Sequence, residues 1–107
     1  LYPAGMKPEL KLDLLQEIEA KVDIPLVLHG GSNNRDDEIG KSVLLGINKI
    51  NIASDIKTAY FNKMRDVLKD KDMREPNIIE PICIEAMKEV VKHKLDLFQT
   101  TGKAVLY

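Results

Sequence analysis

Two short apolar runs in this chain have the character of strands, and each one follows a segment with helical periodicity. Residues 24 to 29 (IPLVLH) show no polar alternation, which indicates a strand buried on both faces, as in a parallel sheet covered by helices. Residues 47 to 53 (INKINIA) form the second run. Strands that alternate with helices predict a parallel α/β sheet with right-handed crossovers. Two strands alone leave unpaired edges, so we expect either association with further copies or, as we prefer, the end of a larger α/β fold.

The predicted helices are defined by apolar residues three and four positions apart and by the residues at their ends. They span residues 9 to 21, 36 to 45, 55 to 71 and 81 to 98, with loops at 1 to 8 and 69 to 76. Asn34 with Asp37 is the predicted N-terminal cap of the second helix, and Ser54 or Asp55 that of the third. Gly46 is a predicted C-cap. The predicted buried faces are Ile56, Tyr60, Met64, Val67 and Leu68 in the third helix and Ile84, Met87, Val91, Leu95 and Phe98 in the last, which Gly102 terminates.

Composition excludes several classes of protein. Of the 107 residues, 44% are hydrophobic and 31% charged, which is typical of a folded globular domain or a piece of one. The net charge of -1 offers no broad attraction to nucleic acid or an anionic membrane. The apolar runs are far shorter than the roughly 20 residues of a membrane span. The single cysteine, Cys83, fits a reducing, cytoplasmic compartment, and the start at Leu1 with no secretory signal leads us to expect a fragment.

The segment His29-Gly30-Gly31-Ser32 follows the first strand directly. In parallel α/β folds, functional groups gather at the carboxyl ends of the strands. A histidine there can bind a metal, the two glycines allow backbone N–H groups to approach a ligand, and Ser32 adds a hydroxyl near a helix N-terminus. The alternative is a histidine that ends a strand before a tight turn, because one histidine does not make a metal site.

The segment Asn51-Ile52-Ala53-Ser54-Asp55 follows the second strand in the same way. Asn51 and Ser54 can hydrogen-bond a polyol or a phosphate, and Ala53 leaves room for the backbone to approach it. The alternative is a simple helix cap. The two loops together make a phosphorylated ligand as well supported as the structural alternatives, because the last two loops of a (β/α)8 barrel commonly form a phosphate site.

Four further residues carry weaker signals. We expect His93, between two lysines in the last helix, to face solvent, and Cys83 to be a small buried or half-buried side chain. Lys49 lies in the second strand and can reach a barrel interior or pair with an acid. Lys57, one turn into the third helix, can hold an anion or simply be solvated.

The motifs IPLVLHGGS and INKINIASDIKTAYF resemble the C-terminal part of the class II, metal-dependent ketose-bisphosphate aldolases, which include fructose- and tagatose-bisphosphate aldolases. The opening LYPAGMKPELKLDLLQEI and the closing LFQTTGKA are similar to the corresponding family segments. The resemblance therefore implies that residues 1 to 107 are a single partial domain. It would comprise the last two β/α units and the terminal helix of a (β/α)8 TIM barrel.

The resemblance also implies roles for individual residues. His29 takes the place of the last of three histidines that bind the catalytic Zn²⁺. Gly30, Gly31 and Ser32 belong to a loop that binds a substrate phosphate and a monovalent cation, Na⁺ or K⁺. The loop contacting dihydroxyacetone phosphate corresponds to Asn51, Ile52, Ala53 and Ser54. Three positions depart from the family pattern: Asn33 replaces a glycine, Ser54 a threonine and Asp55 a glutamate.

The implied activity of the intact protein is the reversible aldol cleavage of fructose 1,6- or tagatose 1,6-bisphosphate to dihydroxyacetone phosphate and glyceraldehyde 3-phosphate, a glycolytic reaction of carbohydrate metabolism. Zn²⁺ would act on the ketone oxygen as a Lewis acid. No catalytic acid or base is expected in this chain, because the family's catalytic aspartate and other zinc histidines lie upstream of the segment that Leu1 matches.

The chain alone is therefore expected to be an inactive fragment of a lyase. Alternatives are a non-catalytic remnant that still binds phosphosugars and an independent small α/β protein that assembles with its own copies. The family resemblance implies a homodimer or homotetramer for the intact enzyme.

Overall fold

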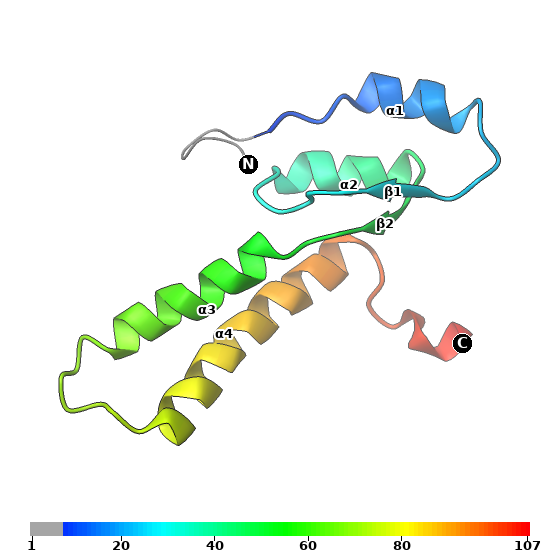
Figure 1. Ribbon diagram of the computed structural model, residues 1–107. Helices are drawn as coiled ribbons and strands as arrows, with labels where there is room; N and C mark the ends of the chain where they lie inside the picture. The colour runs from blue at the N-terminus through cyan, green and yellow to red at the C-terminus, as the bar shows by residue number, and fades with distance from the viewer. Residues whose placement is uncertain (1–7) are drawn as a thin grey trace.

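The structure is a computed structural model that describes residues 8–107, so the loop predicted at residues 1 to 8 lies outside the described residues except for Pro8. The elements follow the predicted order, with a short 3-10 helix, η1, added near the end (Figure 1). Their bounds are α1 (Leu12–Glu19), β1 (Leu26–Leu28), α2 (Asp36–Leu44), β2 (Ile47–Ile50), α3 (Ser54–Val67), α4 (Pro76–Leu97) and η1 (Lys103–Leu106).

The strands β1 and β2 pair in parallel, as the alternation of strands and helices predicts. Leu26 lies opposite Ile47 and Leu28 opposite Ile50, with an irregularity in the register after Leu26. At this irregularity the side chain of Asn48 completes the pairing, since its Oδ1 accepts a hydrogen bond from the Leu26 N–H at 2.9 Å. The register therefore brings the carboxyl ends of both strands to one edge.

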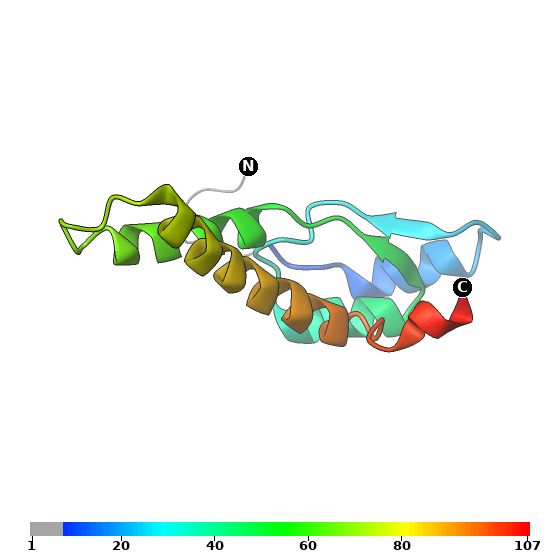
Figure 2. The same cartoon turned by 90° about the horizontal axis from the view of Figure 1, so that it is seen from below.

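The prediction that β1 is buried on both faces is wrong for the described residues. Val27 is 44% exposed, and Leu26 and Leu28 are half-buried. Figure 2 shows the reason: α1 and α2 both lie on the same side of the two strands. A strand is enclosed on both faces only when a second layer covers it.

The helices α3 and α4 form an antiparallel hairpin that projects away from the strands (Figure 1). The buried side chains of α4 are Ile79, Cys83 and Lys94, so Cys83 is buried as expected. The predicted buried face of α4 is wrong, because Ile84, Val91 and Leu95 are each more than a third exposed. In α3 the predicted face is half-buried apart from Leu68, which is 49% exposed.

Both ends of the last helix, α4, differ from the prediction, and the residues at each end explain the difference. The last helix begins at Pro76, not at Pro81, because Pro76 occupies the first turn, where a missing N–H costs nothing, and Pro81 is accommodated inside the helix. The same helix ends before Gly102, with Phe98 as its C-cap and Gln99 in a left-handed conformation. No helix among residues 8–107 combines the length and the apolar character that crossing a membrane requires.

The predicted C-cap role of Gly46 is confirmed at the end of α2. Gly46 follows the C-cap residue Leu45 with φ of +119°, a backbone conformation that side chains disfavour. A Cβ at this position would lie 2.5 Å from Cγ of Glu19 in α1. Gly46 therefore permits both the turn into β2 and the close approach of α1.

We predict that Gly46→Ala lowers the free energy of unfolding by about 1–3 kcal/mol, because the left-handed backbone is strained and Glu19 must move. Gly40→Ala is the matched control. It lies inside α2, where a new Cβ would make an ordinary 3.6 Å contact with Leu97, and it is expected to stabilise the protein by about 0.5–1 kcal/mol. Urea denaturation measures both changes, and equal effects of the two variants would contradict the special role of Gly46.

Candidate functional site

The loops that follow β1 and β2 are joined by backbone hydrogen bonds. The pairing of the strands continues past their ends, since the Asn51 N–H donates to the Leu28 carbonyl at 2.9 Å. The Gly31 N–H then donates to the Asn51 carbonyl at 2.8 Å. The predicted neighbourhood of the two loops at one edge of the sheet is thus confirmed.

The two glycines of the first loop differ in their surroundings and in their backbone conformation. Gly31 is buried, and a Cβ on it would lie 2.5 Å from Cγ2 of Ile50 and 3.2 Å from Cγ2 of Ile52, so only glycine fits there. Gly30 has φ of +66° and open space around it. The expectation that both N–H groups approach a ligand is wrong for Gly31, because its N–H is used in holding the second loop.

The imidazole of His29 is exposed at the end of β1 and is oriented by the second loop. Its Nδ1 lies 2.9 Å from Nδ2 of Asn51. Residues that hydrogen-bond one ring nitrogen of a metal-binding histidine fix the ring and leave the other nitrogen for the metal. An amide has a donor end and an acceptor end, so Asn51 can match either tautomer of the ring.

His29 fits the role of one metal ligand, and the described residues supply no complete site. Among residues 8–107 no three His, Cys, Asp or Glu side chains gather closely enough to hold a metal ion. Catalytic zinc commonly has three protein ligands. A zinc ion at His29 therefore needs ligands from beyond this group of residues.

Ser32 connects the first loop to the start of α3. Its Oγ accepts hydrogen bonds from the N–H groups of Ala53, at 3.1 Å, and Asp55, at 3.4 Å. The predicted capping of α3 by Ser54 or Asp55 is therefore wrong: the N-cap residue is Ala53, and Ser32 provides the capping oxygen from the other loop. Since its oxygen accepts these bonds, the hydroxyl hydrogen of Ser32 remains as a donor. Ser54 is exposed at the first position of the helix.

Two asparagines close the first loop. Asn33 has φ of +64°, a conformation that asparagine tolerates, and its N–H donates to Oδ1 of Asp55 at 3.0 Å. The amide of Asn34 is buried and donates to the Gly30 carbonyl at 2.9 Å. The predicted cap pair of Asn34 with Asp37 is wrong, since α2 has Arg35 as its N-cap residue and no side-chain cap.

A network of charged side chains connects α4 with the first residues of α2 and α3. The ammonium of Lys94 in α4 is 2.9 Å from Oδ2 of Asp55 and 3.8 Å from Oδ1 of Asp36. Nε2 of His93 lies 2.6 Å from the other oxygen of Asp36. His93 is about half exposed, as expected, and it pairs with a carboxylate that the sequence did not reveal.

Lys94 is a functional candidate that was not predicted from the sequence. A signal for it was present, because Lys94 falls on the same stripe of α4 as the buried residues Ile79 and Cys83. A lysine on a buried helical stripe requires a partner. Of the other weak candidates, Lys49 and Lys57 are both exposed.

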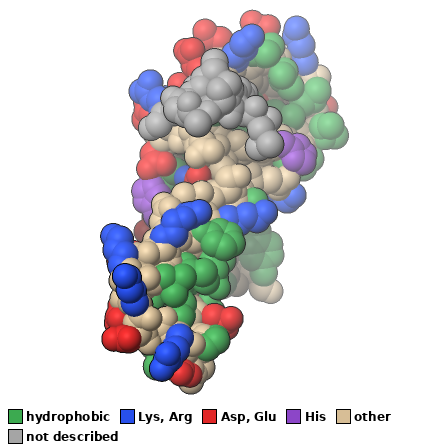
Figure 3. Space-filling model, turned by 60° about the vertical axis from the view of Figure 1, so that its left-hand side comes forward, with side chains coloured by type: hydrophobic (Ala, Val, Ile, Leu, Met, Phe, Trp, Pro, Cys, Tyr) green, Lys and Arg blue, Asp and Glu red, His purple; other side chains and the backbone are tan. Residues whose placement is uncertain are grey.

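The two histidines do not share a site. Nδ1 of His29 lies beside Asn51 in the second loop, whereas Nε2 of His93 lies beside Asp36 at the start of α2. Figure 3 accordingly shows histidine side chains, in purple, at two separate places on the face that it draws. The two imidazole rings therefore have different neighbours.

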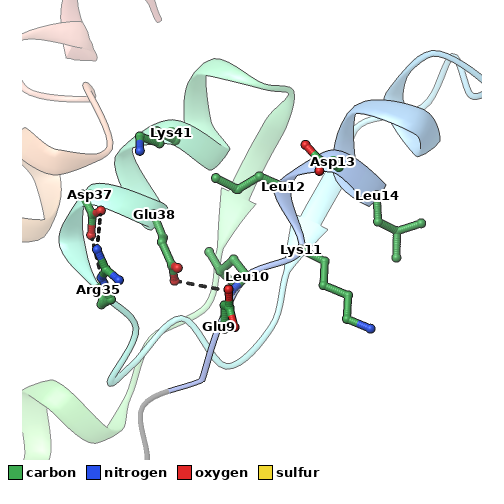
Figure 4. Close-up of a pocket in the computed structure, with 10 residues that line it drawn as sticks. All are labelled: Glu9, Leu10, Lys11, Leu12, Asp13, Leu14, Arg35, Asp37, Glu38 and Lys41. Carbon is green, nitrogen blue, oxygen red and sulfur yellow. Dashed lines mark hydrogen bonds and ion pairs between the residues drawn. The ribbon is translucent and has the colours of Figure 1, made fainter.

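A separate hollow of about 650 Å³ lies between residues 9–14 and α2 (Figure 4). Some of its polar groups bind one another: Glu38 accepts the Leu10 N–H at 3.3 Å, and Arg35 contacts both oxygens of Asp37. The hydrogen bond from Arg35 lowers the pKa of Asp37 below its ordinary value. None of the loop residues 29–32 or 51–54 lines this hollow, so it is separate from the edge of the sheet that carries His29.

Comparison with known proteins gives the family. Residues 1–103 match the family described as fructose-bisphosphate aldolase class-II. The chain belongs to this family. The crystal structure of the YdjI aldolase from Escherichia coli K12 superimposes with a TM-score of 0.82 at 31% identity, covering 91% of this chain and 36% of that one. The chain thus has the fold of a C-terminal part of a (β/α)8 barrel.

Two curated relatives of the aldolase chain carry names with different substrates. One is 6-phospho-5-dehydro-2-deoxy-D-gluconate aldolase from Bacillus licheniformis, 42% identical over 92% of this chain and 34% of the relative. The other is sulfofructosephosphate aldolase from Alkalicoccus urumqiensis, 35% identical over 94% of this chain and 36% of the relative. The chain spans about a third of the length of these relatives.

We predict that Ser32→Ala lowers the free energy of unfolding by about 0.5–2 kcal/mol, because α3 loses its capping oxygen. Ser54→Ala is the control and should change this free energy by less than about 0.5 kcal/mol, since the Ser54 side chain caps nothing. Chemical denaturation of both variants provides the measurement. A larger loss in Ser54→Ala than in Ser32→Ala would show that Ser54 is the cap.

Proposed function

We propose that the complete protein containing this chain is a zinc-dependent class II aldolase that reversibly cleaves a phosphorylated ketose to dihydroxyacetone phosphate and an aldehyde. The observation that carries this proposal is the junction of the two loops. The Gly31–Asn51 and Ser32–Ala53 hydrogen bonds hold a histidine and a helix N-terminus at one edge of the sheet. The chain alone would lack the other metal ligands and the acid or base.

The phosphate would bind beside Ser32, next to the start of α3. The N-terminus of this helix carries a positive partial charge, which attracts a phosphate. Ser32 and Ser54 would each donate a hydroxyl hydrogen. Gly30, with open space around it, and the small side chain of Ala53, whose N–H is bound to Ser32, would leave room for the ligand. Ile52 packs against Gly31 and would hold the second loop in place. The same loop, Gly30 to Ser32, would also contact the monovalent cation.

The imidazole of His29 would be one ligand of Zn²⁺, and Asn51 would hold the ring in its orientation. When bound, the ion would supply Lewis acidity at the substrate's ketone oxygen. The amide of Asn51 would also hydrogen-bond a hydroxyl of the substrate. The phosphate-binding loops would fix the distance between the phosphate and the reacting carbons, so that binding energy at one end of the substrate orients the other.

The substrate class is a ketose with a phosphate next to the ketone. Fructose 1,6-bisphosphate and tagatose 1,6-bisphosphate, suggested by the sequence motifs, both have this arrangement. The name of the Bacillus licheniformis relative describes it too, with the ketone at carbon 5 and the phosphate at carbon 6. Cleavage between carbons 3 and 4 of each compound releases dihydroxyacetone phosphate, which is therefore the half of the substrate that these loops would hold.

We predict that His29→Ala abolishes metal-dependent cleavage and lowers the zinc content of the complete enzyme, because one of the few protein ligands is lost. The assay supplies the three candidate substrates in parallel and detects dihydroxyacetone phosphate; zinc is measured by atomic absorption. His93→Ala is the control, since His93 pairs with Asp36 instead, and should keep its zinc. Unchanged zinc and turnover in His29→Ala would disprove the ligand assignment. Phosphosugar binding without zinc dependence in the unaltered protein would instead indicate a non-catalytic binding protein.

We further predict that Ser54→Ala weakens the binding of dihydroxyacetone phosphate by about 1.5–3 kcal/mol, the contribution of a hydrogen bond to a charged group. Titration calorimetry measures this change. Thr58→Ala, an exposed hydroxyl one turn further along α3, is the matched control and should bind normally. Full affinity in both Ser54→Ala and Ser32→Ala would place the phosphate elsewhere.

A further inference from the structure

The side chain of Lys94 is buried although it carries a charge. Only 8% of it is exposed, and its ammonium lies 2.9 Å from the Asp55 carboxylate, which is itself 19% exposed. The second carboxylate near it, that of Asp36, is more distant at 3.8 Å, is about half exposed and is paired with His93. Asp55 is therefore the principal partner of Lys94.

Both oxygens of Asp55 are engaged, and they connect different parts of the chain. Oδ2 contacts Lys94 of α4, and Oδ1 accepts the N–H of Asn33 in the first loop at 3.0 Å. The N–H of Asp55 itself donates to Oγ of Ser32. Asp55 thus links the end of α4, the start of α3 and the loop that carries Ser32.

A pair of this kind contributes more to geometry than to stability. Removing two charges from water costs free energy that their attraction only partly returns, so apolar residues often stabilise a fold equally well. An apolar pair, however, would leave no carboxylate in a fixed orientation toward the Asn33 N–H. The pair of Lys94 and Asp55 is therefore suited to holding the first loop in one conformation.

We propose that Lys94 is a positioning residue: through Asp55 it holds the loop from Gly30 to Asn34 in the conformation that binds the substrate phosphate. This inference rests on the proposed function for the nature of the ligand. Lys94 acts only through Asp55 and does not itself contact the substrate.

The test uses three variants of the complete protein. Lys94→Met removes the charge and keeps the length of the side chain. Asp55→Asn removes the charge of the partner and keeps an oxygen for the Asn33 N–H. Lys92→Met is the matched control, because Lys92 is an exposed lysine of the same helix that pairs with Glu89 on the helix surface.

Three quantities are measured for each variant: affinity for dihydroxyacetone phosphate by calorimetry, KM and kcat for cleavage, and hydrogen exchange of the Asn33 amide. We expect Lys94→Met to weaken binding and raise KM at least tenfold, to change kcat less than threefold, and to speed exchange at Asn33 at least tenfold. Asp55→Asn should weaken binding less than Lys94→Met does, and Lys92→Met should match the unaltered protein. A thermal melt shows that each variant is folded.

A purely structural role for Lys94 gives a different result. In that case Lys94→Met lowers the unfolding temperature but leaves the affinity, KM and exchange at Asn33 within twofold, which would overturn the proposal. If Lys94→Met does not fold, the same criteria apply to Asp55→Asn, for which unchanged affinity and exchange would overturn it. If the unaltered protein neither binds nor produces dihydroxyacetone phosphate, the proposed function is wrong, and exchange at Asn33 alone then decides whether Lys94 positions the loop.

Discussion

The continuation of strand pairing into the loops is the constraint on which the rest of this structure depends. After Leu28 and Ile50 the strands end, but the hydrogen bonds of Asn51 and Gly31 keep the two backbones together for several more residues. This brings His29 to the amide of Asn51 and Ser32 to the first N–H groups of α3. Gly31 allows this close approach of the loops, because a Cβ there would lie 2.5 Å from Cγ2 of Ile50.

The fold was predictable because its determinants are local. Apolar runs separated by helical periodicity gave the order of the elements, and Gly46 marked the end of α2. The neighbourhood of the two loops followed from the parallel arrangement of the strands. The burial of individual faces was not predictable in the same way, because the exposure of Val27 depends on which layers cover the sheet.

The details of the site depend on contacts between residues distant in the sequence. Local rules assigned the capping of α3 to Ser54 or Asp55, whereas the capping oxygen belongs to Ser32, more than twenty residues earlier. Because Ser32 caps the helix, the carboxylate of Asp55 can instead bind the Asn33 N–H and the Lys94 ammonium. Periodicity marked Lys94 as lying on a buried stripe, but its partner could be found only once α4 was packed beside α3.

The position of Ser32 has a consequence for how this enzyme family can diversify. The oxygen of Ser32 accepts hydrogen bonds from N–H groups at the start of α3. Its hydroxyl hydrogen remains as a donor to the phosphate that we propose beside it. Under the proposed function, a substitution at Ser32 therefore changes both the stability of α3 and the binding of the phosphate. Changes in the preference for the aldehyde are then expected from residues that contact the far end of the substrate, with the phosphate-binding loops left as they are.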